Sequence, residues 1–322
     1  MFDYTLLHKN IQNWYREYGR ITLPWRNTNI AYEIYLSEIM LQQTQVKTVL
    51  ERFYFPFLKK FPTLKDVAQA PLDDILKAWE GLGYYTRARN LHKTAQITQG
   101  KLPTSAKALV ELPGIGPSTA NAVACFAFKE AVPILDANVK RILHRFFAIK
   151  KSNDKLLWKK AYELLDSKNA YIYNQALMDI GSLICKHKTP HCIDCPLEIM
   201  CQGKKSPLLY PEKKVTKSKP IKKRTVVIYS YGDQYALTQN QTNLLKGLWA
   251  FPQYQEFEYS KKVTQIGSFK HHYSHFTLEA TLLVVHSSMK KELSYYSIEE
   301  IHNLALSSAD KKALSLLELY LK

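Results

Sequence analysis

Two carboxylic acids, Glu38 and Asp136, lie in settings that could give each of them a chemical role. Glu38 lies inside a helical pattern and is followed by Ile39, Met40 and Leu41. A carboxyl with such neighbours is partly desolvated, which raises its pKa and favours the protonated form. Asp136 stands just ahead of an amphipathic run, where an aspartate ordinarily caps a helix. The ordinary alternatives are a surface glutamate and a simple cap, so a joint role requires the fold to bring the two acids together.

A glycine turn precedes Asp136 in the segment Leu112-Pro113-Gly114-Ile115-Gly116. Gly114 and Gly116 let backbone N–H groups approach a ligand closely, and the helix expected after them presents its positive N-terminal end. The run after Asp136 has an apolar face and a basic face, and the basic face consists of Lys140, Arg141, His144 and Arg145. An acid beside a phosphate-binding turn indicates chemistry on nucleic acid, although a Gly-x-Gly turn is often only a connector between helices.

The charge balance favours a polyanionic partner. The 322 residues include 45 Lys and Arg against 28 Asp and Glu, a net charge of +17. Such a surface attracts nucleic acid because each neutralised phosphate releases condensed counterions, although a lysine-rich proteome would produce the same excess. No apolar run reaches the ~18 residues needed to span a bilayer, and the first residues do not form a signal peptide. We therefore expect a cytoplasmic protein without a membrane partner.

Four of the five cysteines lie close together in the sequence. Cys185, Cys192, Cys195 and Cys201 fall within seventeen positions, whereas Cys125 stands alone in an apolar run that suits a small core residue. A reducing compartment argues against disulfides, so the group of four is predicted to bind metal. Tetrahedral zinc and an iron–sulfur cluster both accept four thiolates, and the spacing leaves the choice between them open.

The elements that must position these residues are mostly helices. Helical patterns continue to about residue 203, with no convincing strand before that point. Between 204 and 224 nine Lys or Arg, one acid and three prolines indicate a basic interdomain linker. Beyond it, 226–231 and 235–238 flank a Gly-Asp turn, 276–286 alternates like a strand, and 309–321 is typical of an amphipathic helix. We predict a mainly α domain over 1–203, a linker over 204–224 and an α+β domain over 225–322.

Several stretches resemble a known family. Residues 112–123 with 134–141 resemble the helix-hairpin-helix and aspartate of the endonuclease III superfamily of DNA glycosylases. Residues 37–46, 81–90 (GLGYYTRARN) and 174–185 (NQALMDIGSLIC) are similar to the MutY-type adenine DNA glycosylases. The similarity runs nearly continuously from Leu23 to Cys201 and resumes at 247–252 and 271–276.

The resemblance implies a two-lobed helical domain with an iron–sulfur loop and a smaller Nudix-like domain that lacks the acidic Nudix helix. It implies a [4Fe–4S] cluster on Cys185, Cys192, Cys195 and Cys201. It also implies a bacterial, nucleoid-associated and monomeric repair enzyme that excises adenine paired with 8-oxoguanine or guanine in double-stranded DNA.

The resemblance further assigns roles to single residues. It makes Glu38 the general acid and Asp136 the carboxylate that stabilises the sugar cation. Supporting active-site positions are Asn138, Ser118, Trp25 and Arg26. Expected DNA contacts are the wedge Gln43, the stacking Tyr84, the turn glycines Gly114 and Gly116, Lys140, and the 8-oxoguanine-reading loop Tyr273-Ser274-His275, whose first position is usually Phe in the family.

Other functions remain open at this stage. An endonuclease III-type glycosylase with lyase activity places a Schiff-base lysine in the hairpin, but this chain has Ser118 there, which cannot form an imine. Lys140 could trap an abasic site adventitiously. Thymine-mismatch glycosylases of the same superfamily lack the second domain. A non-catalytic iron–sulfur DNA-binding module would use the same hairpin and cysteines but has no need of both Glu38 and Asp136.

Overall fold

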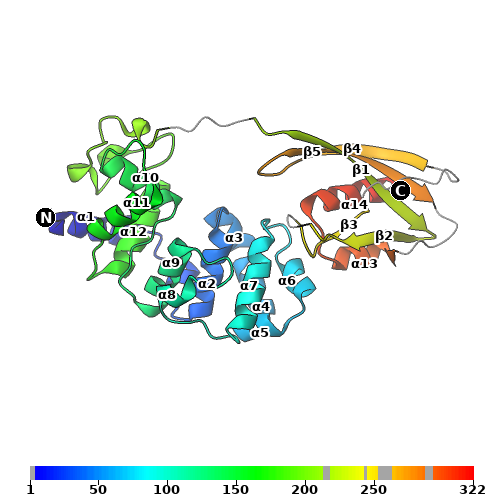
Figure 1. Cartoon of the computed structure of the whole chain (residues 1–322), viewed down its shortest axis with the longest axis horizontal. Coiled ribbons are helices and arrows are strands. Elements are labelled where there is room, and N and C mark those ends of the chain that lie inside the picture. Colours follow the sequence, from blue (N-terminus) through cyan, green and yellow to red (C-terminus); the bar gives the residue numbers. More distant parts are fainter. Residues whose placement is uncertain (1–3, 213–217, 243–244, 253–262, 287–292) are drawn as a thin grey trace. The chain divides into compact units, whose positions relative to one another are not determined.

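The computed structural model describes residues 4–212, 218–242, 245–252, 263–286 and 293–322. Helices occupy the first two hundred residues, and strands begin at Ile221 (Figure 1). The chain divides into two compact units, each built from two separate stretches of sequence. Unit 1 comprises Met1–Val46 with Ile97–Val215, and unit 2 comprises Lys47–Gln96 with Thr216–Lys322. None of the helices within the described residues is long and apolar enough to cross a membrane.

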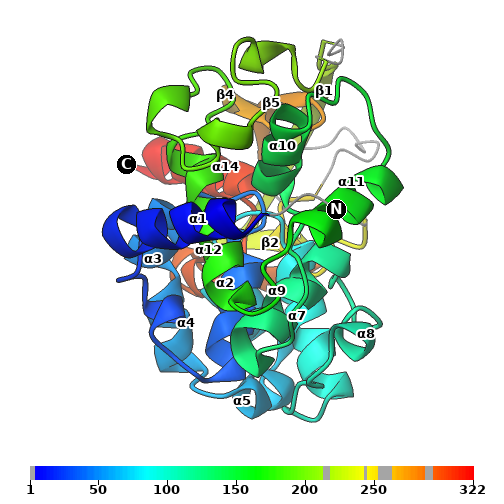
Figure 2. The same cartoon turned by 90° about the vertical axis from the view of Figure 1, so that its left-hand side faces the viewer.

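Unit 1 is helical in its described residues. Its α-helices are α1 (Thr5–Tyr18), α2 (Ala31–Leu41), α8 (Ala106–Leu109), α9 (Pro117–Phe128), α10 (Ala137–Phe146), α11 (Asp154–Leu164) and α12 (Ala170–Leu183). Short 3-10 helices are η1 (Pro24–Arg26), η2 (Cys192–Asp194), η3 (Glu198–Met200) and η4 (Pro207–Leu209). Helices α1 and α12 lie side by side, as Figure 2 also shows, and α10 packs against α12. The predicted helical domain before residue 203 is therefore confirmed as a fold class.

Amphipathic periodicity explains the core of unit 1. In α10 the apolar residues Val139, Ile142, Leu143 and Phe146 are all buried, as predicted from their spacing. On α1, Leu7, Ile11, Trp14 and Tyr15 are likewise buried, whereas Tyr18 at its C-terminal end is 59% exposed. The side chains of α1, α10, α11 and α12 share one hydrophobic cluster, so this packing holds the start of α10, where Asp136 lies, in a fixed place.

In its described residues, unit 2 combines helices from its first stretch with a sheet and two further helices from its second stretch. The helices from its first stretch are α3 (Val46–Arg52), α4 (Tyr54–Lys60), α5 (Leu64–Gln69), α6 (Leu72–Ala78) and α7 (Thr86–Ile97). The second stretch contributes β1 (Ile221–Tyr231), β2 (Gln234–Gln239), β3 (Trp249–Ala250), β4 (Val263–His272), β5 (Thr277–His286), β6 (Ser294–Tyr296), α13 (Ile298–Asn303) and α14 (Ser308–Leu321). The strand order is β3-β2-β1-β5-β4, with β6 paired to β2.

The sheet contains the predicted hairpin and the predicted strand. Strands β1 and β2 pair antiparallel around Gly232, and β5 covers nearly the whole alternating segment 276–286. Strand β1 also pairs in parallel with β5 over ten consecutive positions, from Ile221↔Thr277 to Ser230↔His286. Buried side chains from one set of positions on β1, β2 and β5 form a core with α13 and α14, and Val227, Tyr229, Ala236 and Val285 form a second, smaller cluster. The predicted α+β class for this part of the chain is confirmed.

Parts of the stretch expected to be a linker belong to these elements. Residues 203–212 fold onto unit 1, since Gly203 N donates to Arg145 O at 2.9 Å and Glu212 N donates to Lys150 O at 3.0 Å. Strand β1 begins at Ile221, inside the expected linker, because its backbone pairs with β5 while the first four side chains stay exposed. Exposed lysines on a paired strand resemble a linker in composition. Residues 213–217 lie outside the described part of the chain.

Candidate active site

Glu38 lies on α2, a helix with buried residues on all sides rather than a single apolar stripe. The carboxyl itself is half-buried. Burial and, to a smaller extent, the negative charge of Asp136 raise the pKa of Glu38 from 4.5 to about 7, against the opposing effect of the positive charge of Arg26. Desolvation disfavours the ionised form, so Glu38 retains a large protonated fraction at neutral pH.

Asp136 is the N-cap of α10 and is also half-buried. Its Oδ1 accepts a 2.7 Å hydrogen bond from Val139 N, and its Oδ2 accepts a 3.3 Å bond from Asn138 Nδ2. Burial raises the pKa of Asp136 overall, although the hydrogen bonds from Val139 and Asn138 and the charge of Arg141 oppose this effect. Asp136 can therefore both cap α10 and act on Glu38, because the charge of the capping carboxylate raises the pKa of Glu38.

Three side chains hold the backbone that leads to Asp136. Ser118 Oγ accepts a 3.3 Å hydrogen bond from Leu135 N, and Asn121 Nδ2 donates a 2.7 Å bond to Pro133 O. Asn174 accepts a 3.0 Å bond from Ile134 N and donates a 2.9 Å bond to Val132 O. Asn174 is fully buried. Sequence reasoning singled out Ser118 but missed both asparagines, because amides at these positions have no distinguishing local pattern.

Asn138 connects Asp136 to a second layer of contacts. Its Oδ1 accepts a 2.8 Å bond from Arg141 NH2, which also donates to Gly181 O at 2.6 Å, and Arg141 Nε donates to Cys185 O at 2.7 Å. Gly181 on α12 is needed for this approach, since a Cβ there would lie 2.6 Å from Asn138 Cβ. Contact between α10 and α12 at a glycine therefore positions the amide that binds Asp136.

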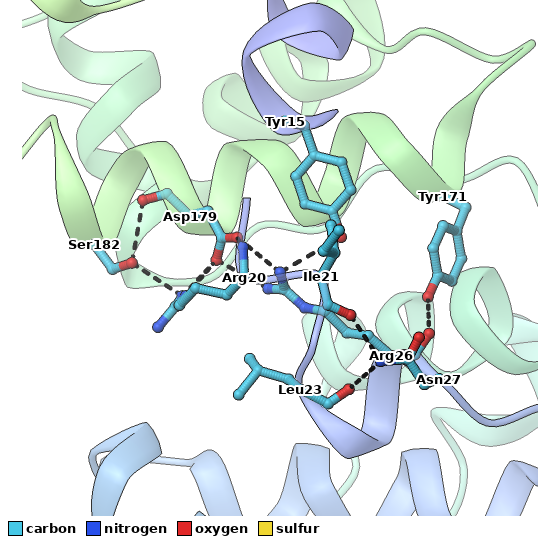
Figure 3. Close-up of polar contacts among 9 residues, drawn as sticks. All are labelled: Tyr15, Arg20, Ile21, Leu23, Arg26, Asn27, Tyr171, Asp179 and Ser182. Carbon is cyan, nitrogen blue, oxygen red and sulfur yellow. Dashed lines mark hydrogen bonds and ion pairs between the residues drawn. The ribbon is translucent and has the colours of Figure 1, made fainter. Parts of the chain in front are cut away.

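Trp25 and Arg26, expected near the base pocket, form the short helix η1 ahead of α2, and both are buried. The Arg26 guanidinium makes a double ion pair with Asp179, NH1 to Oδ2 at 2.7 Å and NH2 to Oδ1 at 2.9 Å (Figure 3). Its charge also reaches Glu38. Sequence reasoning missed Asp179, whose place within a helical run gave no sign that it would be buried.

The expected DNA contacts of unit 1 occupy turns and a basic surface. Gly114 has φ +74°, a conformation that favours glycine, and Gly116 caps α9. Gln43 is exposed with φ +58° just beyond α2. Lys140 makes a 2.7 Å ion pair with Asp154. A hollow nearby is lined mostly by basic side chains: Lys140, Arg141, His144, Arg145, Lys150, Lys151, His187 and Lys188.

The residues expected to contact the base opposite adenine belong to unit 2. Tyr84 has φ +51°, is 46% exposed, and lies under the Arg87 guanidinium, 5.3 Å from its ring centroid. In the loop between β4 and β5, Tyr273 is half-buried and stacks at 4.7 Å on Phe276, while Ser274 and His275 are exposed. The tyrosine at the position where the family usually has Phe therefore serves as the inner anchor of that loop.

The four clustered cysteines line one hollow together with Arg145. Arg145 NH1 donates to Cys185 Sγ at 3.2 Å. Burial, with a smaller effect from the neighbouring thiols, raises the pKa of Cys195 to about 12 and that of Cys201 to about 11. Within the described part of the chain, no three His, Cys, Asp or Glu side chains converge as ligands of a single metal ion. Cys125 is buried in the core, as expected.

Comparison with known proteins covers both parts of the chain. Residues 36–166 match the HhH-GPD superfamily of base excision DNA repair proteins, and residues 224–316 match the NUDIX domain. The adenine DNA glycosylase of Buchnera aphidicola subsp. Baizongia pistaciae is 39% identical, covering 85% of this chain and 84% of that protein. The adenine DNA glycosylase of Buchnera aphidicola subsp. Schizaphis graminum is 36% identical, covering 95% and 97%. The solved structure of a thermostable thymine-DNA glycosylase matches with a TM-score of 0.58 at 29% identity, covering 63% of this chain and 99% of that one.

Proposed function

The chain belongs to the adenine DNA glycosylase family of base excision repair enzymes, and from that premise we propose that it hydrolyses the N-glycosidic bond of adenine in DNA. The observation that carries this proposal is the pair of acids in unit 1. The pKa of Glu38 is raised to about 7, so a substantial fraction stays protonated at neutral pH, and this pKa responds to the charge of Asp136. A proton donor and a carboxylate in one site are what cleavage of a glycosidic bond requires.

Glu38 supplies the proton. Adenine must first leave the base stack, which costs a few kcal/mol. Because adenine departs poorly as an anion, protonation at N7 by Glu38 weakens the bond to the sugar. General acid catalysis of this kind contributes roughly 10²–10⁴-fold in rate, and it is most effective when the pKa of the donor lies near the working pH, as the value of about 7 for Glu38 does.

Asp136 stabilises the positive charge that develops on the deoxyribose as the bond breaks. The hydrogen bonds from Val139 N and Asn138 Nδ2 favour its ionised form against the effect of burial. Water then adds to C1′ and loses a proton, which gives an abasic site and free adenine. The two carboxyl groups thus divide the work as they do in glycoside hydrolases.

The proposed substrate is double-stranded DNA with adenine opposite 8-oxoguanine or guanine. Gln43 would wedge into the duplex, Tyr84 would stack beside the opposite base, and Tyr273, Ser274 and His275 would read it. The exposure of Gln43, Tyr84, Ser274 and His275 supports contact with a macromolecule. The basic hollow at the start of α10 offers phosphate contacts.

The four cysteines would hold a [4Fe–4S] cluster. Their thiols line one hollow, and the burial that raises the pKa of Cys195 disfavours thiolates there unless a cationic centre compensates them. An N–H donor already points at Cys185 Sγ, as is usual for cluster sulfurs. The bound cluster would supply structural cross-linking of the loop rather than a chemical step.

The same proposal includes a domain organisation, an oligomeric state and a cellular setting. A catalytic domain would span 1–203 and a recognition domain 225–322; of the expected linker between them, residues up to Glu212 fold onto unit 1 and residues from Ile221 belong to β1. The protein would act as a monomer on chromosomal DNA in a cytoplasmic, nucleoid-associated setting.

An endonuclease III-type lyase is the rival activity, and Ser118 argues against it. Its hydroxyl accepts a hydrogen bond from Leu135 N, so this position supports the Asp136 loop and offers no amine. Borohydride trapping on an abasic site separates the two activities: strong trapping that survives Lys140→Ala would favour the lyase. A non-catalytic DNA-binding module has no use for the raised pKa of Glu38.

A single-turnover assay on four duplexes tests the proposal. Adenine or thymine is paired with guanine or 8-oxoguanine, and base release is measured for the wild type, Glu38→Gln and Asp136→Asn. The wild type and the surface control Glu299→Gln should both release adenine, whereas Glu38→Gln and Asp136→Asn should not. Release of thymine, or full activity in either active-site variant, would refute the assignment.

A further inference from the structure

Asp179 on α12 is the most enclosed acid in unit 1: its side chain has no exposed surface. Two arginines surround it (Figure 3). Arg26 makes the double ion pair described above, and Arg20 donates from its backbone N and its Nε at 2.8 Å each and from NH2 at 2.5 Å. Burial alone would raise the pKa of Asp179, but the hydrogen bonds and charges of Arg26 and Arg20 outweigh it and lower the pKa. Asp179 is therefore ionised.

Arg26 would be costly to bury without this carboxylate. Only 4% of its side chain is exposed, compared with 28% for Arg20. A buried guanidinium needs a partner charge, and Asp179 is the acid that pairs with it among the described residues. Tyr15 OH accepts a weak 3.5 Å bond from Arg26 NH1, and Tyr171 OH donates to Arg26 O at 3.1 Å. The guanidinium is thus held by α12, while its own short helix leads directly into α2.

The position of Arg26 matters because its charge acts on Glu38. The helix η1, which carries Arg26, packs against α2, which carries Glu38. Among the described residues, Asp136 and Arg26 are the charged groups that shift the pKa of Glu38. Arg26 in turn faces Asp179 and Tyr15, and Arg20 faces Asp179 and Ser182. A change in the negative charge that offsets the Arg26 guanidinium therefore changes the pKa of Glu38, the proton donor.

We propose that Asp179 is a positioning residue for adenine excision, whose carboxylate holds the Arg26 guanidinium in place and offsets its positive charge beside Glu38. The inference rests on the proposed function of Glu38 as general acid. Asp179 touches neither substrate nor reacting atoms, and it acts through Arg26. Without it, the uncompensated positive charge stabilises the carboxylate of Glu38, so the proton is lost at a lower pH.

The pH dependence of single-turnover adenine release from an A·8-oxoguanine duplex tests this. The wild type should lose activity as pH rises through about 7, the pKa of Glu38. In Asp179→Asn that midpoint should fall by about one pH unit, the lower end of the 1–3 units by which a nearby positive charge commonly lowers the pKa of a carboxyl. The rate at pH 8 should then drop about tenfold, with most activity recovered at pH 5.5.

Two further variants keep the test decisive if Asp179→Asn folds poorly. Arg26→Gln should move the midpoint above the wild-type value, and the double variant Arg26→Gln/Asp179→Asn should return it to or above that value. Asp166→Asn is the matched control, because Asp166 is a buried acid that binds Gln12 and Asn169 but no arginine, and it should leave the midpoint unchanged.

The outcomes distinguish this proposal from the function on which it rests. A wild type that releases no adenine overturns the proposed function. An active wild type whose midpoint is the same in Asp179→Asn and in Arg26→Gln overturns only the role of Asp179. An equal loss of rate at every pH that the double variant does not restore indicates a purely structural role and also overturns it.

Discussion

Replacement of Glu38 by glutamine should abolish adenine release and, at the same time, stabilise the folded protein at neutral and higher pH. The reason is the penalty that the fold imposes on the ionised form. Burial and the nearby charge of Asp136 raise the pKa of Glu38 from 4.5 to about 7. Glutamine has nearly the same shape and carries no charge at any pH, so it escapes this penalty while losing the proton that the reaction needs.

The magnitude follows from the two pKa values. Each pKa unit is worth 1.36 kcal/mol, so the difference between 4.5 and about 7 corresponds to about 3 kcal/mol. Between these pH values the folded state holds a proton that the unfolded state has released, so wild-type stability falls as pH rises. Glu38→Gln should therefore match the wild type below pH 4.5, gain through the interval, and be more stable by up to about 3 kcal/mol above pH 7.

Urea denaturation at a series of pH values measures the effect, with base release measured on the same preparations. The control is Glu299→Gln, an exposed glutamate at the start of α13, for which the difference in unfolding free energy should stay small at every pH. A Glu38→Gln protein that is less stable than the wild type at pH 8, or whose stability difference does not change between pH 4 and 8, would refute the reasoning.

Three other predictions concern the supports of the site and the fold. Gly181→Ala places a methyl group 2.6 Å from Asn138 Cβ, so single-turnover adenine release should fall at least about tenfold while DNA binding, measured by fluorescence anisotropy, changes little; an unchanged rate would contradict the positioning of Asn138 by α12. Glu80→Ala removes a carboxylate that is 8% exposed and that pairs with two lysines at 2.9 and 2.7 Å, so the unfolding free energy should fall by about 1–3 kcal/mol, and a loss no larger than that of Glu299→Ala would count against this role. Cys192→Ser should lower the iron content and weaken DNA binding, and wild-type values of both would argue against a cluster held by four cysteines.

Periodicity along the chain predicted the elements whose packing is local or amphipathic. The stripe on α10 has a 3.6-residue period because one face packs against α12, and the Gly232 hairpin needs only two neighbouring strands. The beginning of β1 could not be predicted in this way. Its partner β5 lies more than fifty residues later in the chain, and three of its first four side chains, all exposed, are basic, so nothing in the local pattern distinguishes a paired strand from a tether.

The residues of the candidate site likewise divide into those with a recognisable local sequence pattern and those defined only by distant contacts. Glu38 and Asp136 stand in recognisable local settings, an apolar helix and a helix start. Asp179 does not, because its partners Arg20 and Arg26 lie more than 150 positions away in the sequence. The sequence around Gly181 also gives no indication of its role, because only the close packing of α10 shows that a side chain there has no room. Contacts of this kind depend on the whole packing of unit 1, which the sequence of any single segment does not contain.

The state of the Glu38 carboxyl at neutral pH can be observed directly. In protein labelled with 13C at glutamate Cδ, the Glu38 resonance is identified by its absence in Glu38→Gln and followed as a function of pH. A midpoint near 7, which moves lower when Asp136→Asn removes the neighbouring negative charge, is the result predicted here. A midpoint near the ordinary 4.5 would mean that Glu38 is ionised at neutral pH and cannot donate the proton, which would contradict the account.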